Sequence, residues 1–183
     1  ARAPGSVEWC WVGEGGGGGV GGPGRPWGGM PLAKGPNDWW TIDFKGWFRT
    51  GDGRRCEPLT VRDLFSRYVL AVVLLPQQSD AAVRRALRRV FRRYGLPKTI
   101  RVDNGAPFGG SGALGLSRLS VWWLRLGIAV DFIRPAHPQD NGAHEQMHRV
   151  LRAEVASPPA QSVAAQNRRN QAWVVFYNQE RPH

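Results

Sequence analysis

The sequence predicts an α/β domain in which a mixed β-sheet is covered by helices on both sides. Three observations predict this class. The chain has 183 residues, of which 42% are hydrophobic, so it is long enough to bury one core. Three apolar segments follow one another closely between residues 38 and 76, which indicates an antiparallel meander. After them, helical and extended segments alternate, a pattern that adds parallel strands with helices packed across them.

Five segments are predicted to be strands. Residues 38–48, DWWTIDFKGWF, have the aromatic and β-branched content of a strand, and residues 56–66 follow a GDGRR turn as the second strand. Residues 67–76 form a near-continuous apolar run closed by proline, which is typical of a buried strand. Two short strands are expected at residues 98–103 and 128–135. The expected sheet therefore combines a three-strand antiparallel meander with two parallel strands.

Four segments are predicted to be helices, and the clearest covers residues 79–95. It begins at a serine that can cap it and ends at a glycine. Apolar residues at helical spacing form its buried stripe, and six arginines fill the other face. We expect that arginine face to be solvated, with DNA contact as the alternative. The other helices are expected at residues 116–127, 142–155 and 161–179.

The first 36 residues are expected to be a disordered or linker segment, and residues 37–183 to form the folded domain. The early segment contains the tract Gly15–Gly19 and further glycines and prolines. Ordering such a stretch loses more chain entropy than its few apolar residues can offset. The domain boundary is therefore predicted near residue 37.

The charge balance points to a polyanionic partner. The chain has 25 Lys and Arg against 14 Asp and Glu, a formal net charge of +11 and a pI near 11.1. Nucleic acid is the first candidate, and an anionic membrane surface is the second. Apolar runs fall short of the ~18–20 residues that a membrane span needs. Cys10 and Cys56 give no disulfide framework, so we expect a reducing, cytoplasmic setting.

Three acidic residues occupy positions that suit a two-metal phosphoryl-transfer site. Asp43 lies inside the first strand, between Ile42 and Phe44, where an unpaired charge is expensive. Asp103 ends the fourth strand, and Glu145 lies in the first turn of a helix. If the first and fourth strands are neighbours, Asp43 and Asp103 lie side by side, with Glu145 across from them. Two-metal enzymes need such carboxylates around a pair of Mg²⁺ ions ~3.5–4 Å apart.

Each of these acids, taken alone, also has a purely structural explanation. Asp43 could pair with Lys45 or an arginine at a strand edge. Asp103 could form the DNG turn, and Glu145 could be an acid favoured by the helix dipole. The surrounding sequence has to decide between the two interpretations.

The strings around these acids are WTIDFKG, TIRVDNGAPF and RPAHPQDNGAHEQMHRVL, and the chain closes with FYNQERPH. Together they resemble the catalytic core of the retroviral-integrase-like DDE transposases, especially those of bacterial insertion sequences. The resemblance covers residues 37–183 and implies an RNase H-like fold with five strands and flanking helices. It also implies that Asp43, Asp103 and Glu145 hold two Mg²⁺ or Mn²⁺ ions. These ions would activate water to nick a transposon end, and then the freed 3′-OH to attack target DNA.

The same resemblance implies a DNA-binding surface and partners. Arg149 and Arg152 lie four and seven residues after Glu145, on a helical face that the family commonly keeps basic against DNA phosphates. His148 and Asn141 are further candidates for DNA contact. DNA is expected as the partner, together with further copies of the chain when it is active. Full-length relatives usually carry a helix-turn-helix region ahead of the core.

Two alternatives stay open. The first is a truncated, non-catalytic DNA-binding remnant of a transposase. The second rests on His144-Glu145-Gln146-Met147-His148, a literal match to the H-E-x-x-H pattern of zinc peptidases. There, the two histidines would ligate Zn²⁺ with the glutamate as general base. The glycine and third histidine of metzincins do not follow, so we expect both histidines to face DNA or solvent.

Overall fold

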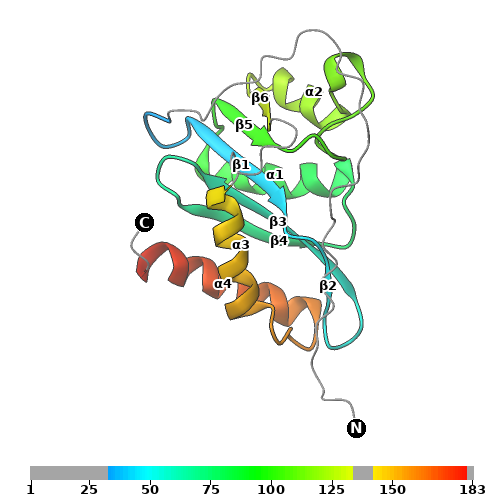
Figure 1. The fold of residues 1–183 in the computed structure, drawn as a ribbon, viewed down its shortest axis with the longest axis vertical. Coiled ribbons are helices and arrows are strands. Elements are labelled where there is room, and N and C mark those ends of the chain that lie inside the picture. Colours follow the sequence, from blue (N-terminus) through cyan, green and yellow to red (C-terminus); the bar gives the residue numbers. More distant parts are fainter. Residues whose placement is uncertain (1–32, 134–141, 181–183) are drawn as a thin grey trace.

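The computed structural model describes residues 33–133 and 142–180, and Figure 1 shows how their elements are arranged. One six-stranded sheet runs through the domain. Its strands are β1 (Trp39–Phe44), β2 (Phe48–Arg49), β3 (Arg55–Asp63), β4 (Val69–Leu75), β5 (Thr99–Val102) and β6 (Ala129–Phe132).

The strand pairing confirms the predicted mixed sheet. β3 pairs antiparallel with β1 and with β4, which makes the meander, and β5 pairs parallel with β1 and with β6. The sheet has six strands instead of five because the segment predicted as one strand over residues 38–48 divides into β1 and β2. Gly46, between them, has a backbone φ of 87°, which takes the chain out of the extended conformation.

Four α-helices lie close to the predicted ranges: α1 (Asp80–Tyr94), α2 (Arg118–Arg125), α3 (Gly142–Val155) and α4 (Val163–Glu180). A short 3₁₀ helix, Ala113–Gly115, precedes α2. The ends of α1 follow the sequence signals. The Ala82 N–H donates to the Ser79 hydroxyl at 3.4 Å, and the Gly95 N–H, at a φ of 85°, donates to the Phe91 carbonyl.

Alternation along the strands separates the two larger of three hydrophobic clusters among the described residues. Trp40 and Ile42 of β1 belong to the larger core, which packs against α1 and α2. Val69 and Val72 of β4 belong to the second core, which packs against Met147 and other residues of α3 and α4. Helices therefore cover both faces of the sheet, with α3 and α4 side by side on one of them (Figure 1).

Several strand residues that alternate with the larger core on β1, β3 and β5 are polar. They are Thr41 and Asp43 of β1, Thr60 and Arg62 of β3, and Arg101 of β5. Arg101 is 2% exposed and donates from Nε to Asp131 of β6 at 2.6 Å. Polar side chains between a sheet and its helices cost free energy unless they are hydrogen-bonded or paired. This polar lining beneath α3 is where a site can form.

Asn178 of α4 anchors the last helix to the sheet. Its Oδ1 accepts from the Val69 N–H at 2.8 Å, and its Nδ2 donates to the Val69 carbonyl at 2.9 Å. The amide thereby satisfies both backbone groups of the first residue of β4. Tyr177, beside it, is 8% exposed in the second core. The FYNQ string therefore holds the helical layer in place.

Two further expectations concern the early residues and membranes. The boundary between the linker segment (residues 1–36) and the folded domain (residues 37–183) stays a prediction, because residues 1–32 lie outside the described part of the chain. Cys10 lies there too, whereas Cys56 is buried with a free thiol. Within the described residues, no helix has the length and apolarity needed to cross a bilayer.

Candidate active site

Asp43 lies one residue before the end of β1 and opposite Thr60 of β3. One of its carboxylate oxygens accepts the Phe44 N–H at 2.8 Å. The side chain is 22% exposed. The carboxylate is therefore held at the edge of the polar lining and can still reach solvent or an ion.

Asp103 follows directly after β5, the parallel neighbour of β1. Every paired residue of the two strands differs by 60 in number, as in Trp39–Thr99 and Thr41–Arg101. The same offset, carried two residues further, aligns Asp43 with Asp103. The Gly105 N–H donates to Asp103 Oδ1 at 3.2 Å. The condition of the sequence prediction, that the first and fourth strands be neighbours, is confirmed.

Asp103 is accessible to solvent, but the protein around its carboxyl group excludes enough water to disfavour the charged form. This burial raises the pKa of Asp103, and the hydrogen bond from Gly105 opposes the shift in part. The next residue, Asn104, fixes the turn by donating from Nδ2 to the Ile133 carbonyl at 2.6 Å. A carboxylate with a raised pKa is one that a cation would stabilise.

Glu145 is exposed in the first turn of α3. Lys45 links it to Asp43: burial and the nearby Arg152 lower the pKa of Lys45, whereas the charges of Asp43 and Glu145 raise it. Both acids therefore act on one ammonium group that lies just after β1. The arrangement gathers acidic and basic groups from β1 and α3 on one side of the sheet.

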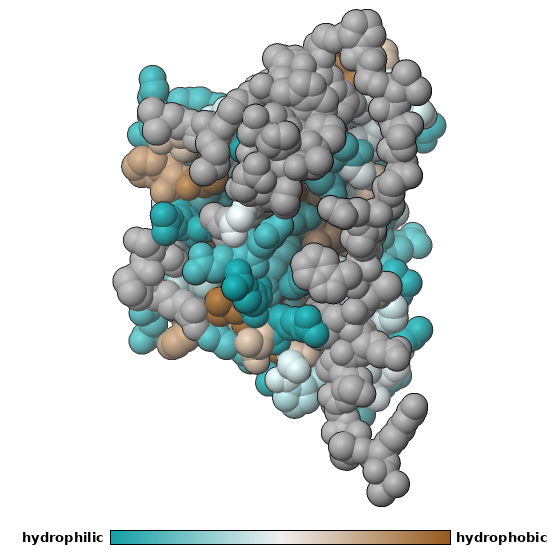
Figure 2. All heavy atoms as spheres, in the orientation of Figure 1, coloured by the Kyte–Doolittle hydropathy of each residue, from teal (hydrophilic) through white to brown (hydrophobic). Residues whose placement is uncertain are grey.

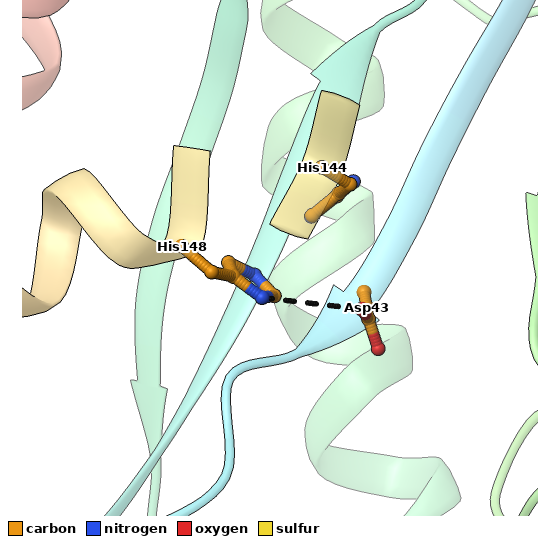
Figure 3. Close-up of side chains that lie close together, drawn as sticks. All are labelled: Asp43, His144 and His148. Atoms are coloured by element: carbon orange, nitrogen blue, oxygen red, sulfur yellow. Dashed lines mark ion pairs between the residues drawn. The ribbon is translucent and has the colours of Figure 1, made fainter. Parts of the chain in front are cut away.

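Asp43, Asp103 and Glu145 offer oxygen ligands from three separate elements, which is the donor chemistry that Mg²⁺ prefers. Their carboxylates do not form a group within 4.8 Å of one another. Among the described residues, the group of three that meets this distance is Asp43, His144 and His148 (Figure 3).

The two histidines were expected to face DNA or solvent, and solvent exposure was wrong. His144 is 1% and His148 is 5% exposed, because α3 lays them on the polar lining of the sheet. Thr41 Oγ1 lies 2.8 Å from His144 Nδ1, and Thr60 Oγ1 lies 2.6 Å and 2.7 Å from Nε2 of His144 and His148. Two strand threonines therefore satisfy rings that come from one helix.

Burial keeps both imidazoles neutral. Desolvation, followed by the charge of Arg62, lowers the pKa of His144 to about 3. Desolvation, His144 and Lys45 together lower the pKa of His148 well below its usual value. Neutral rings retain a lone pair on one nitrogen each, which is the form that binds metal ions.

This burial also bears on the zinc peptidase alternative. A hydrolytic zinc site keeps an open position for water and substrate. Here His144 and His148 are enclosed, while Glu145 is exposed on another side of α3. A peptide therefore has no access to an ion held by both rings with Glu145 as the base.

Of the residues expected to contact DNA, Arg149 is exposed and Arg152 is half-buried beside Lys45. His148 is buried, so its ring has little surface to offer a phosphate. Asn141 lies outside the described residues. The face turned to the viewer in Figure 2 is largely hydrophilic around α3.

The arginine face of α1 borders a surface hollow of about 430 Å³. Arg84 stacks on Trp122 at 5.0 Å from the ring centroid and reaches the Arg118 carbonyl at 3.4 Å. The hollow is lined by Asp80, Ala81, Arg84, Arg85, Arg88 and Arg118. This concave basic surface is compatible with either a solvated face or DNA contact.

The family models called integrase core domain match residues 33–138 and residues 126–183, and the first match alone covers more than half of the chain. The chain belongs to the integrase core domain family. Proteins of insertion elements are also similar to this integrase core. One from IS407 of Burkholderia multivorans is 32% identical over 156 residues, which is 84% of this chain and 53% of that protein. One from IS476 of Xanthomonas euvesicatoria is 33% identical over 150 residues, 81% of this chain and 41% of that protein.

This integrase core thus spans about half the length of the curated relatives it matches. Solved structures share its fold at low sequence identity. A chain in the structure of a simian T-cell lymphotropic virus intasome with the PP2A regulatory subunit B56 gamma has a TM-score of 0.66 and 18% identity, covering 87% of this chain and 56% of that one. The HTLV-2 integrase catalytic core with magnesium has a TM-score of 0.60 and 15% identity, covering 80% and 89%. The predicted RNase H-like fold is confirmed.

The sequence analysis considered Lys45 only as a structural partner of Asp43, and it missed Thr41 and Thr60 of this integrase core site. Thr41 could have been found, because it lies two residues before Asp43 and strands repeat with a period of two. Thr60 could not have been found from the sequence, because only the register of β3 against β1 brings its hydroxyl group into contact with the histidines of α3.

Proposed function

We propose that this chain is the catalytic core of a DDE-type transposase that cleaves DNA strands and transfers them to a target. The observation that carries the proposal is the parallel register of β1 and β5, whose offset aligns Asp43 with Asp103 at one edge of the sheet. Glu145 supports it, because it shares Lys45 with Asp43 as an electrostatic neighbour. Membership of the integrase core domain family is consistent with this chemistry.

In this proposal, Asp43, Asp103 and Glu145 hold two Mg²⁺ or Mn²⁺ ions. The bound ions would lower the pKa of the attacking water or hydroxyl and neutralise charge on the phosphate. The chain would supply three oxygen donors from separate elements and would partly desolvate the Asp103 carboxyl group. The raised pKa of Asp103 supports this role, because a desolvated carboxylate gains most from a nearby cation.

The positive groups beside the acids would bind the DNA backbone. Lys45 and Arg152 lie close enough that each charge disfavours the other, and a phosphate between them would relieve this repulsion. Arg149 adds an exposed guanidinium one turn after Glu145 on α3. Such contacts fix the position of a DNA strand without reading its sequence.

DNA and further copies of the chain are the proposed partners. Solved neighbours include an intasome, and the HTLV-2 core is described with magnesium in dimeric and trimeric forms. The net charge of +11 supports a polyanionic partner, and we propose that it acts on DNA in the bacterial cytoplasm.

A non-catalytic DNA-binding remnant is the second candidate. The observation in its favour is that the three carboxylates do not lie within 4.8 Å of one another, whereas Asp43 and two histidines do. Both candidates predict DNA binding. Only the transposase predicts chemistry that depends on the three acids.

A nicking assay on supercoiled plasmid separates the two candidates. The full chain is incubated with Mg²⁺ or Mn²⁺ beside Asp43→Asn, Asp103→Asn and Glu145→Gln. We expect metal-dependent nicking by the parent chain and a loss of at least about 100-fold in each variant. Glu180→Gln, at the exposed end of α4, is the matched control and should nick like the parent. Equal nicking by all the variants would remove the acids from the site.

A further inference from the structure

Asp43 belongs to two groups of ligand atoms at once. It is one of the three acids proposed to hold Mg²⁺, and it also lies with His144 and His148 in a group whose ligand atoms are within 4.8 Å of one another. Figure 3 shows the three side chains converging from β1 and α3. Carboxylates suit Mg²⁺ and Mn²⁺, whereas imidazole nitrogens suit Zn²⁺, Cu²⁺ and Ni²⁺. The second group therefore selects a different class of ion.

The hydrogen bonds at Thr60 indicate which nitrogen atoms carry protons. Thr60 Oγ1 donates to the Asp43 carbonyl at 3.0 Å, and a hydroxyl has only one proton to give. Both Nε2 atoms near Thr60 must then be donors, at 2.6 Å from His144 and 2.7 Å from His148. Each Nδ1 consequently carries a lone pair.

The lone pair of His144 Nδ1 accepts from the Thr41 hydroxyl at 2.8 Å. The lone pair of His148 Nδ1 faces Asp43 Oδ2 at 4.0 Å. Two atoms that both carry lone pairs gain nothing from facing each other directly. Two ligand atoms at ~2.0–2.1 Å from a tetrahedral Zn²⁺ ion lie about 3.3–3.4 Å apart, so a small inward movement of the two side chains would let both atoms bind one ion. The position between them suits a cation.

The outer partners that a metal-bound imidazole needs are already present. A ligating histidine usually hydrogen-bonds through its other nitrogen, which fixes the ring. Thr41 serves Nδ1 of His144, and Thr60 serves Nε2 of both rings. Both threonines are buried, at 4% and 0% exposure. His144 would ligate through Nδ1 in place of its bond from Thr41, while its Nε2 keeps the bond to Thr60.

We propose that Asp43, His144 and His148 form a binding site for one borderline transition-metal ion, with Zn²⁺ as the typical occupant. We further propose that this ion inhibits the chain, a step that rests on the proposed function. An ion at this site would take an oxygen of Asp43 and add a positive charge beside the Mg²⁺ ligands. Both effects oppose the loading of Mg²⁺.

Spectroscopy of Co²⁺ tests the site without reference to activity. The tag-free full chain is titrated with Co²⁺, which replaces Zn²⁺ and has visible d–d absorption bands that report its ligands. We expect about one ion per chain with the bands of a four-coordinate, nitrogen-ligated ion. His148→Asn and His144→Asn should each weaken binding at least about tenfold. Asp103→Asn is the matched control, because it removes an acid of the Mg²⁺ site alone and should retain the bands.

A second measurement covers the case in which the histidine variants fold poorly. Zn²⁺ at about 100 times its dissociation constant should raise the melting temperature of the parent chain, because it binds only the folded state. Absence of both the Co²⁺ bands and the thermal shift in the parent would overturn the site. Bands that persist in both histidine variants would overturn the ligand assignment.

Inhibition is tested separately by adding Zn²⁺ to the nicking assay at fixed Mg²⁺. We expect Zn²⁺ to suppress nicking, and the concentration for half-suppression to rise at least about tenfold in His148→Asn, relative to its own zinc-free rate. Zinc that binds without slowing nicking would overturn the inhibition while leaving the site. A parent chain that binds Co²⁺ and never nicks DNA would overturn the proposed function, and with it the inhibition, but not the site.

Discussion

Oδ2 of Asp43 and Nδ1 of His148 face each other at 4.0 Å, one from a strand and the other from the helix packed on it. This contact joins two patterns that the sequence keeps 105 residues apart, the WTIDF strand and the HEQMH helix. The histidines of α3 are buried against the sheet, on the side of the sheet where Asp43 lies. Glu145 and Arg149 of the same helix are exposed to solvent. The same helix thus offers different chemistry on its two sides.

The outward side of α3 should set DNA affinity. We predict that Arg149→Ala and Arg152→Ala each weaken DNA binding and reduce the salt slope by about one, because each removes one phosphate contact. Fluorescence anisotropy with a labelled duplex at several salt concentrations measures both quantities. The parent chain should lose at least about tenfold in affinity from 50 to 200 mM salt.

Arg168→Ala is the control for these substitutions, because Arg168 is exposed on α4, away from the acids. It should change affinity less than either α3 variant. A salt slope that is equal in all three variants would contradict a specific role for α3.

Asp103 should lower stability at neutral pH. Burial raises its pKa, so the folded state binds this proton more tightly than the unfolded state does. The protonated Asp103 carboxyl favours the folded state. This contribution is complete below the pKa of Asp103 in the unfolded chain and is lost as the pH rises through its pKa in the folded chain. We predict that Asp103→Asn raises the melting temperature at pH 7, and that this gain shrinks as the pH approaches 4.

Asp52→Asn should show the opposite sign in the same thermal scans. A hydrogen bond from Thr50 lowers the pKa of Asp52, so its contribution is present above the unfolded pKa and is lost as pH falls. Matching signs for the two variants would show that burial does not govern Asp103. A gain for Asp103→Asn together with loss of nicking would also mean that the site is maintained at a cost in stability.

Asn178 should contribute to stability through its two bonds to Val69. We predict that Asn178→Ala lowers the free energy of unfolding by about 2 kcal/mol, because it leaves a strand N–H and carbonyl without their partner. Urea unfolding followed by circular dichroism measures the change. Gln179→Ala, at the exposed neighbouring position, should stay within about 0.5 kcal/mol of the parent. Equal effects at the two positions would contradict the anchoring role.

The strands and helices could be predicted because their signals are local. Ser79 and Gly95 bound α1, and alternating apolar residues mark β1. The break between β1 and β2 was missed, because Gly46 lies within a run of aromatic residues that reads as one strand. Local pattern was also misleading for the histidines, since a polar residue near a helix start usually faces solvent.

The sequence could predict that Asp43 aligns with Asp103 only on the assumption that the first and fourth predicted strands are neighbours in the sheet. The environment of the histidines was not predictable at all, because Thr41 and Thr60 contact His144 across 103 and 84 residues of chain. Such contacts depend on strand register, which is a property of the whole sheet.

Asp43, Asp103 and Glu145 are proposed to share a pair of hard cations, and electron paramagnetic resonance of bound Mn²⁺ tests this sharing most directly. With DNA present, we predict about two Mn²⁺ ions per chain whose spectra show magnetic coupling, as expected for ions ~3.5–4 Å apart. Asp103→Asn should abolish the coupling. Uncoupled ions in the parent chain, or coupling that survives in Asp103→Asn, would contradict the account.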